Sequence, residues 1–290
     1  MSKTTLRRLR FASLISILFV FNIPGLTQTR LNEPTALNVI PAEADRSVPP
    51  KELGIGDYKK MLADDPNNAF VENNLGVLYY SAARYDEALE LISHAATARP
   101  EIWRLQLNAS LVLAQKNSFE GALKYAQAAY AAGPKELRVR QQVCDMYIAT
   151  QKAAEALQCF EGLVGERPVD PEDLLGYGEA LILTGDNAHA ETVLRDAIKT
   201  SPRSAPAYNA LGMAQYRQKR YKDAVESLRE AVSLMPEKAR FRFNMAIAEM
   251  AIQNNDGVMS QYQFLKGSDP KLAAQLYNAM FASKILVAPH

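Results

Sequence analysis

The stretch that decides the fold runs from residue 207 to residue 236 and reads AYNALGMAQYRQKRYKDAVESLREAVSLMP. Its apolar and small residues recur at spacings of three and four, which is the pattern of a helix with one buried face. Leu211 and Gly212 lie in its first half, Ala224 and Leu228 lie in its second half, and Pro236 closes it. Because proline lacks an N–H and clashes with a continuing helix, the stretch predicts two helices joined by a turn, the second of which ends before Pro236.

The same pattern recurs along the chain every 34 residues. Proline stands at positions 66, 100, 134, 168, 202, 236 and 270. A set of residues that we name the small-residue column comprises Gly76, Ser110, Cys144, Gly178, Gly212 and Ala246. A second set, the alanine column, comprises Ala88, Ala122, Ala156, Ala190 and Ala224. Helix axes about 8–10 Å apart require small side chains where the backbones cross. Each unit is therefore predicted to pack a helix A on an antiparallel helix B at these columns.

At these positions the chain resembles the tetratricopeptide repeat family. With the first repeat position set at Ala69, the residues that match the family's columns in the first unit are Leu75, Gly76, Tyr79, Ala88, Ile92, Ala95 and Pro100. The family's tryptophan at the fourth position is replaced, for example by Glu72 in the first unit. The resemblance implies an all-α fold, namely a right-handed α-solenoid of stacked helix-turn-helix repeats. Its six units would begin at residues 69, 103, 137, 171, 205 and 239.

Residues 56–285 are expected to form this solenoid, with six repeats from 69 to 272 and a capping helix at each end, because a repeat buries its face only against a neighbour. The C-terminal capping helix would bury Leu272, Leu276 and Met280. Tyr277 and Phe281 broaden its apolar stripe. Self-association through this C-terminal helix is therefore an alternative to simple capping.

The first 28 residues have the features of an export signal. Four basic residues precede an apolar run from Phe11 to Ile23, and Pro24 and Gly25 follow it. This arrangement predicts a signal peptide and an exported protein, periplasmic or secreted. An uncleaved N-terminal membrane anchor through residues 11–29 is the first alternative. A cytosolic segment that merely resembles a signal is the second. Residues 29–55 contain several prolines without periodicity and are expected to form a flexible linker.

Composition and charge argue against several functions. The chain has 33 basic and 32 acidic residues, and five of the basic ones precede the first acid, Glu33. The remainder is slightly acidic, which argues against nucleic acid as a partner. Two cysteines without a CxxC motif and three histidines leave little material for a metal site. Neither His94 nor His189 has sequence neighbours that suggest a catalytic triad. We therefore expect no enzyme activity, no cofactor and no metal.

Cys144 and Cys159 fall in one repeat, the first at the helix crossing and the second on helix B. We favour the interpretation that both are buried free thiols that act as small apolar side chains. In an oxidising compartment, a disulfide within the repeat is the alternative.

The resemblance places the ligand-binding groove on the A helices, at positions 2, 5, 9, 12 and 13 of each unit. The candidate protein-binding residues at these positions are Asn73, Val77, Tyr80, Leu107, Leu111, Arg138, Asp145, Leu175, Glu179, Ile182, Met213, Tyr216, Arg217, Phe243, Ile247 and Met250. This mixture of large apolar side chains with a few charges suits an amphipathic helix or an extended peptide of another protein. The alternative is that several of these residues only pack one helix A against the next.

These features predict a non-enzymatic scaffold that mediates protein–protein interaction outside the cytoplasmic membrane by binding a peptide or helix in its concave groove. The main alternative is a structural assembly factor of an envelope pilus or secretion machine of the Tad/Flp type, since similar exported repeat proteins have such roles. The chain lacks a lipidation cysteine after its apolar run, which weakens that analogy. An enzyme with an unrecognised site is the third and least favoured interpretation.

Overall fold

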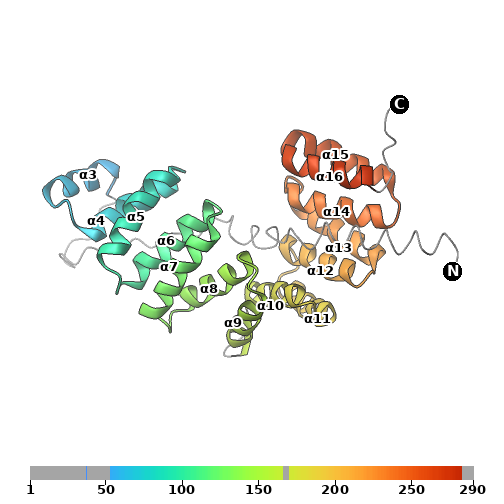
Figure 1. Cartoon of the computed structure of the whole chain (residues 1–290), viewed down its shortest axis with the longest axis horizontal. Coiled ribbons are helices and arrows are strands. Elements are labelled where there is room, and N and C mark those ends of the chain that lie inside the picture. The colour runs from blue at the N-terminus through green and yellow to red at the C-terminus, as the bar shows by residue number, and fades with distance from the viewer. Residues whose placement is uncertain (1–36, 38–52, 166–169, 283–290) are drawn as a thin grey trace. The chain divides into compact units, whose positions relative to one another are not determined.

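The computed structural model describes residue 37, residues 53–165 and residues 170–282 (Figure 1). Every regular element in these ranges is an α-helix. The helices are α3 (Ile55–Asp64), α4 (Ala69–Ser81), α5 (Tyr85–Ala98), α6 (Trp103–Gln115), α7 (Phe119–Ala132), α8 (Leu137–Ala149), α9 (Ala153–Gly165), α10 (Pro171–Thr184), α11 (Asn187–Thr200), α12 (Ala205–Arg217), α13 (Tyr221–Leu234), α14 (Ala239–Ala251), α15 (Asn255–Ser268) and α16 (Pro270–Ala282). The predicted signal or anchor and nearly all of the predicted linker lie outside the described residues.

The 34-residue period sets where the helices begin. The six A helices, α4, α6, α8, α10, α12 and α14, start at residues 69, 103, 137, 171, 205 and 239, which are the predicted first positions of the units. The B helices that follow them start at residues 85, 119, 153, 187, 221 and 255. The B helices α5, α7, α11, α13 and α15 end two residues before an in-register proline. The predicted all-α helical repeat fold is confirmed.

The small-residue column lies where helix A crosses helix B. A Cβ atom added to Gly76 would stand 2.6 Å from the side chain of Ile92, and one added to Gly178 would stand 2.6 Å from Leu194. Both distances are too short for real Cβ contacts. In the second unit Ser110 takes the glycine's place, and its Oγ donates a hydrogen bond to the carbonyl oxygen of Ala122 at 2.8 Å. A Cβ atom on Gly76 or Gly212 would also stand 3.2 or 3.1 Å from the carbonyl oxygen of Ala88 or Ala224, so in the first, second and fifth repeats the two columns meet at the crossing.

The turn between helix A and helix B has a left-handed residue in every repeat. Positive φ angles of 57–64° occur at the non-glycine residues Ala83, Asn117, Gln151, Lys219 and Gln253, and Gly185 has a φ of 92°. These six positions are also 34 residues apart. Because this conformation is costly for most residues with a Cβ atom, although asparagine tolerates it, four of the six turns hold a residue that is locally unfavourable. The stacking of the helices outweighs this local cost.

The described residues fall into two compact units, an N-terminal unit that ends at Cys159 and a C-terminal unit that begins at Phe160. In the N-terminal unit, α3 packs on α4 as a preceding B helix would. In the C-terminal unit, α16 packs on both α14 and α15, as a further A helix would (Figure 1). On α16, Leu276 and Met280 are fully buried, whereas Phe281 is 47% exposed.

Candidate functional site

In the N-terminal unit, most of the candidate binding residues are buried. The buried ones are Asn73, Val77, Leu107, Leu111 and Asp145. Tyr80 is half-buried, and burial, helped by the nearby Tyr85, raises the pKa of its hydroxyl. Arg138 is exposed at the start of α8. The candidate residues of this unit are thus mostly buried, and they include the polar Asn73 and Asp145 as well as apolar side chains.

Two asparagine pairs connect successive A helices. The Nδ2 of Asn108 on α6 donates to Oδ1 of Asn73 on α4 at 2.7 Å. In the C-terminal unit, Nδ2 of Asn244 on α14 donates to Oδ1 of Asn209 on α12 at 2.8 Å. All four side chains are buried, where an amide without partners would be destabilising. These asparagines therefore hold neighbouring repeats in register, a role that the sequence reasoning did not identify.

Cys144 and Cys159 form a disulfide that joins α8 to α9, with their Cα atoms 5.5 Å apart. The favoured interpretation of two free thiols was therefore wrong, and the alternative holds. The physical reason is the repeat geometry: Cys144 stands in the small-residue column at the helix crossing, so its side chain meets helix B. A Cα separation of about 5.5–6 Å is the commonest in disulfides, which is what the crossing provides.

In the C-terminal unit, six candidate residues are buried and three are half-buried. The buried ones are Leu175, Glu179, Ile182, Met213, Ile247 and Met250. Tyr216, Arg217 and Phe243 are half-buried, and Tyr216 and Phe243 pack against the hydrophobic cluster that includes Ile247 and Met250. The structure therefore brings Tyr216, Phe243, Ile247 and Met250 together on α12 and α14.

Arg217 has a structural contact in addition to its position on the predicted face. Its Nη1 donates to the carbonyl oxygen of Ile182 at 2.7 Å. That carbonyl lies in the last turn of α10 and also accepts from the N–H of Gly185, the residue that follows the helix, at 3.3 Å. Burial lowers the pKa of Arg217. Arg217 thus connects α12 to the end of the preceding A helix.

Arg240, at the start of α14, is a further cation on this face. Its guanidinium carbon lies 5.7 Å from the ring centroid of Phe243, a cation–π distance. Burial lowers the pKa of Arg240, while the charge of Asp269 acts in the opposite direction. Its Nε is buried and has no hydrogen-bond partner within the part of the chain that the structure describes. A buried donor without a partner is destabilising.

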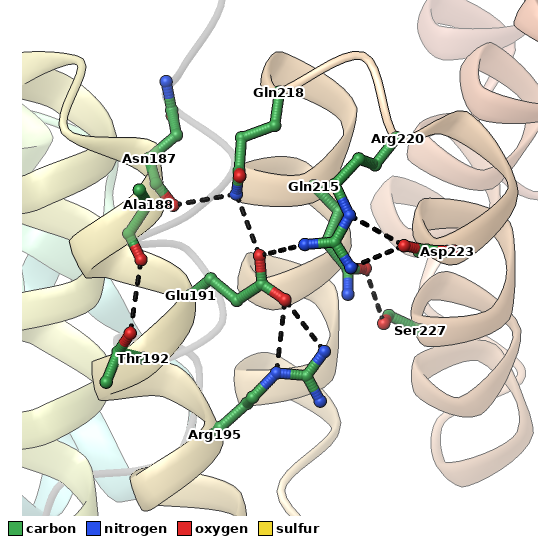
Figure 2. A network of polar contacts seen from close by, with 10 residues as sticks. All are labelled: Asn187, Ala188, Glu191, Thr192, Arg195, Gln215, Gln218, Arg220, Asp223 and Ser227. Carbon is green, nitrogen blue, oxygen red and sulfur yellow. Dashed lines mark hydrogen bonds and ion pairs between the residues drawn. The ribbon is translucent and has the colours of Figure 1, made fainter.

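A polar network fixes α11 against the following repeat (Figure 2). Glu191 on α11 accepts hydrogen bonds from Arg195 at 2.8 Å, from Gln218 at 3.0 Å and from Arg220 at 2.6 Å. Partial burial acts to raise the pKa of Glu191, but these three donors together lower it. Arg220 also pairs with Asp223 on α13 at 2.5 Å. The network joins two repeats through one carboxylate and does not involve the A-helix face.

Among the described residues, no three His, Cys, Asp or Glu side chains come together as a metal centre requires. Within the same residues, no helix has the length and apolarity needed to cross a bilayer.

The model of a tetratricopeptide repeat family matches residues 73–136, 147–205, 184–240 and 209–256, which together make up more than half of the chain. The chain therefore belongs to the tetratricopeptide repeat family. Among curated relatives, it is 24% identical over 196 residues to the human protein O-mannosyl-transferase TMTC1. It is 28% identical over 138 residues to the type IV pilus assembly protein PilF of Pseudomonas aeruginosa.

These matches cover 65% of the chain but only 22% of TMTC1, and 43% of the chain and 54% of PilF. The chain thus spans only part of the curated relatives that it matches. Two solved structures share its fold. PilW, a type IV pilus biogenesis factor, has a TM-score of 0.61 at 16% identity, covering 73% of this chain and 98% of PilW. YrrB, a repeat protein with an unusual peptide-binding site, has a TM-score of 0.53 at 18% identity, covering 69% of this chain and all of YrrB.

Proposed function

We propose that this protein is a non-enzymatic scaffold that acts outside the cytoplasmic membrane and binds a peptide or helix of another protein on the face of its A helices. One observation carries the proposal. The half-buried ring of Phe243 lies beside the cation of Arg240, whose Nε is buried and without a partner in the described residues, and the ring of Tyr216 packs against the same hydrophobic cluster as Phe243. Apolar anchors next to one unsatisfied donor are what recognition of a peptide requires.

The ligand chemistry follows from these groups. An apolar side chain of the ligand would contact Tyr216 and Phe243, and a carbonyl or carboxylate oxygen would accept from Arg240. A charged acceptor would give a stronger hydrogen bond than a neutral one. YrrB, a fold neighbour, is described as having a peptide-binding site, which supports a peptide as the class of ligand.

The proposal of an exported protein rests on the disulfide and on the N-terminus. Disulfides persist in oxidising compartments and are rare in the cytosol, so the Cys144–Cys159 bond favours a location outside the cytoplasmic membrane. The apolar run of residues 11–23 after four basic residues supports the same conclusion. Export by a cleaved signal and retention by an anchor through residues 11–29 both fit this proposal.

The lack of catalytic activity is part of the proposal and rests on the fold. The described helices are accounted for by repeats and caps, and repeats of this kind present surfaces for binding. TMTC1 is named as a transferase, but the chain matches only 22% of that protein, so its activity gives no support for an enzyme here.

Affinity capture from envelope extracts tests the binding proposal. We expect Phe243→Asp and Arg240→Gln to reduce the captured partner at least tenfold, with the helical circular dichroism unchanged. Tyr130→Asp is the matched control, because Tyr130 is an exposed aromatic residue on helix α7, which is not an A helix. Equal capture by the two variants, the control and the wild type would refute the assignment of the face.

A second candidate function is assembly of a pilus or secretion machine. The specific support is the likeness to PilF and PilW, which are described as pilus assembly and biogenesis proteins. Mass spectrometry that identifies the captured partners distinguishes the scaffold role from the assembly role. Pilus or secretion components would favour the assembly role, whereas a partner outside such machines would favour a general scaffold.

A further inference from the structure

The last described helix, α16, has the packing pattern of a seventh helix A, although it begins three residues ahead of the 34-residue period. It packs on α14 and α15. Counted from its first residue, Pro270, its third and seventh positions are Leu272 and Leu276, which are 4% and 0% exposed. The third and seventh positions of α14, Phe241 and Met245, are buried in the same way. The positions of α16 can therefore be compared with those of the six A helices.

The eighth position of α16 is exposed, whereas it is buried in every repeat. In the repeats this position is the small-residue column, and all six of its members are buried. On α16 it is Tyr277, which is 42% exposed, and Phe281 one turn later is 47% exposed. The two rings stack with their centroids 6.5 Å apart. No other helix among those described has two exposed large apolar side chains, so α16 presents an uncovered aromatic face.

The spacing of the exposed residues allows α16 to pack on a copy of itself. Ala274, Tyr277 and Phe281 are exposed and lie three and four residues apart, on one face of the helix. Two antiparallel α16 helices, related by a two-fold axis between positions 277 and 278, place Ala274 of each copy opposite Phe281 of the other. A small residue opposite a large one lets two helix surfaces interdigitate. The same axis places the hydroxyl-bearing ring of Tyr277 opposite the amide of Asn278.

The charges of α16 also favour a second copy as the occupant of this face. Lys271 is the one charged residue between Pro270 and Ala282, so no like charges meet in the middle of the pair. Lys271 lies in the first turn, where the positive end of the helix dipole disfavours a cation, and the last turn has no basic residue. An antiparallel second copy brings each lysine to the C-terminal carbonyl groups of the other helix, where a cation is favourable.

We propose that the aromatic face of α16, defined by Ala274, Tyr277 and Phe281, is a homodimer interface that packs antiparallel on the same face of a second copy of the chain. Such an interface uses one surface patch on both copies, so it closes into a dimer and does not extend into a filament. The inference goes beyond the proposed function and is independent of it, since it involves neither Phe243 nor Arg240.

Sedimentation equilibrium of the purified full chain tests the proposal. We expect the wild type to dimerise and Phe281→Asp to raise the dimer dissociation constant about tenfold or more, because the dimer would then bury a carboxylate against apolar surface. Ala274→Leu should also weaken the dimer, because it fills the space that receives Phe281. Tyr130→Asp is the matched control on α7 and should dimerise as the wild type does. A monomeric wild type, or equal dissociation constants for Phe281→Asp and Tyr130→Asp, would overturn the proposal.

Lys271→Glu tests the antiparallel arrangement. A negative charge in the first turn is favourable to the helix itself, so the variant should keep the helicity of the wild type. The loss of the cation at the end of the other helix should raise the dimer dissociation constant about threefold or more. An unchanged dissociation constant would contradict the arrangement.

A crosslinking measurement does not depend on how the variants fold. A photoreactive phenylalanine analogue replaces Phe281 in the full chain, and this protein is mixed with isotopically labelled wild type. We expect crosslinks to α16 peptides of the labelled copy. Crosslinks within one copy only, to other helices only, or to nothing would overturn the proposal. Loss of partner capture in Phe243→Asp is a separate result, so failure of the dimer and failure of the proposed function are distinguishable.

Discussion

The residue between helix A and helix B has a left-handed backbone conformation, which is energetically unfavourable for most amino acids. Lys219 has a φ of 64° and Gly185, at the same repeat position, has a φ of 92°. A residue with a Cβ atom loses roughly 1 kcal/mol or more in this conformation, and glycine does not. The sequence reasoning missed this set of positions, because only one of its six members is glycine.

Exchanging these residue types gives a paired prediction. Lys219→Gly should stabilise the protein by about 1 kcal/mol, and Gly185→Ala should destabilise it by about the same amount. A Cβ atom at Gly185 would meet nothing within 4 Å, so the effect there belongs to the backbone alone. Urea unfolding measures both changes. A loss of stability in Lys219→Gly would show that its side chain, and not its backbone, matters.

Glu249 on α14 is a buried carboxyl group whose hydrogen bonds and nearby charges only partly offset its loss of solvation. It is 3% exposed, and its Oε1 accepts from Nδ2 of Asn254 at 3.3 Å. Burial raises its pKa from an ordinary 4.5 to about 7, although the charge of Arg229 and a hydrogen bond with Gln261 oppose this rise. The folded protein therefore keeps the proton on Glu249 at pH values where the unfolded chain releases it.

The raised pKa of Glu249 makes the free energy of unfolding depend on pH. Below about pH 4.5 Glu249 is protonated in both states and has no effect, and stability then falls as the pH rises towards about 7. Since each pKa unit corresponds to about 1.4 kcal/mol, the loss above pH 7 is at most about 3 kcal/mol. Glu249→Gln should therefore gain stability relative to the wild type between pH 5 and pH 8 in urea unfolding. A stability difference between the two proteins that does not change with pH would contradict the shifted pKa.

At the scale of the helix pair, the crossing of α12 and α13 in the fifth repeat is tightly packed and allows a direct test of that packing. A Cβ atom on Gly212 would stand 2.6 Å from Cγ of Leu228 and 3.1 Å from the carbonyl oxygen of Ala224. Gly212→Ala should therefore cost roughly 1–3 kcal/mol by overpacking. Gly267→Ala on α15 is the matched control, since nothing lies within 4 Å of its added Cβ atom. It should be neutral or slightly stabilising, and thermal melting that ranks the two variants in the opposite order would refute the crossing.

The disulfide between α8 and α9 stabilises one helix pair by a covalent bond. It closes a loop with a sequence separation of 15, for which about 3 kcal/mol of stabilisation is expected. The double variant Cys144→Ala, Cys159→Ala should lose about that amount in denaturant unfolding under oxidising conditions. Reductant should lower the stability of the wild type to that of the variant and leave the variant unchanged. Wild-type unfolding that does not respond to reductant would mean that the thiols are free in solution.

At the scale of the helices, the helix boundaries could be predicted from the sequence because the residues that set them act on their immediate neighbours. Proline ends helix B, and the small-residue column marks the crossing, so the first residue of each A helix followed from the period alone. The disulfide was less accessible, because a cysteine in the small-residue column has the same size as the serine of another repeat. A cysteine that forms a disulfide differs from one that only packs at the crossing because it lies close to Cys159. That proximity depends on which helices pair.

At the scale of the molecule, the candidate site was harder to predict than the fold. Asn73 looked like a ligand-binding residue on a solvent-facing wall, yet it pairs with an asparagine of the next repeat, as Asn209 does. A side chain on helix A gives the same sequence pattern whether it contacts a ligand or the neighbouring helix. The burial of Leu37, which is 7% exposed, could not be predicted either, because a single apolar residue in a segment with prolines has no periodicity.

The central claim is that this repeat protein functions by holding another protein on its A-helix face. The most direct measurement places a photoreactive phenylalanine analogue at position 243 of the full chain in living cells, with the same analogue at position 130 as the control. The account predicts discrete crosslinked products with another protein from position 243 and none from position 130. No product from position 243, or the same products from both positions, would contradict it.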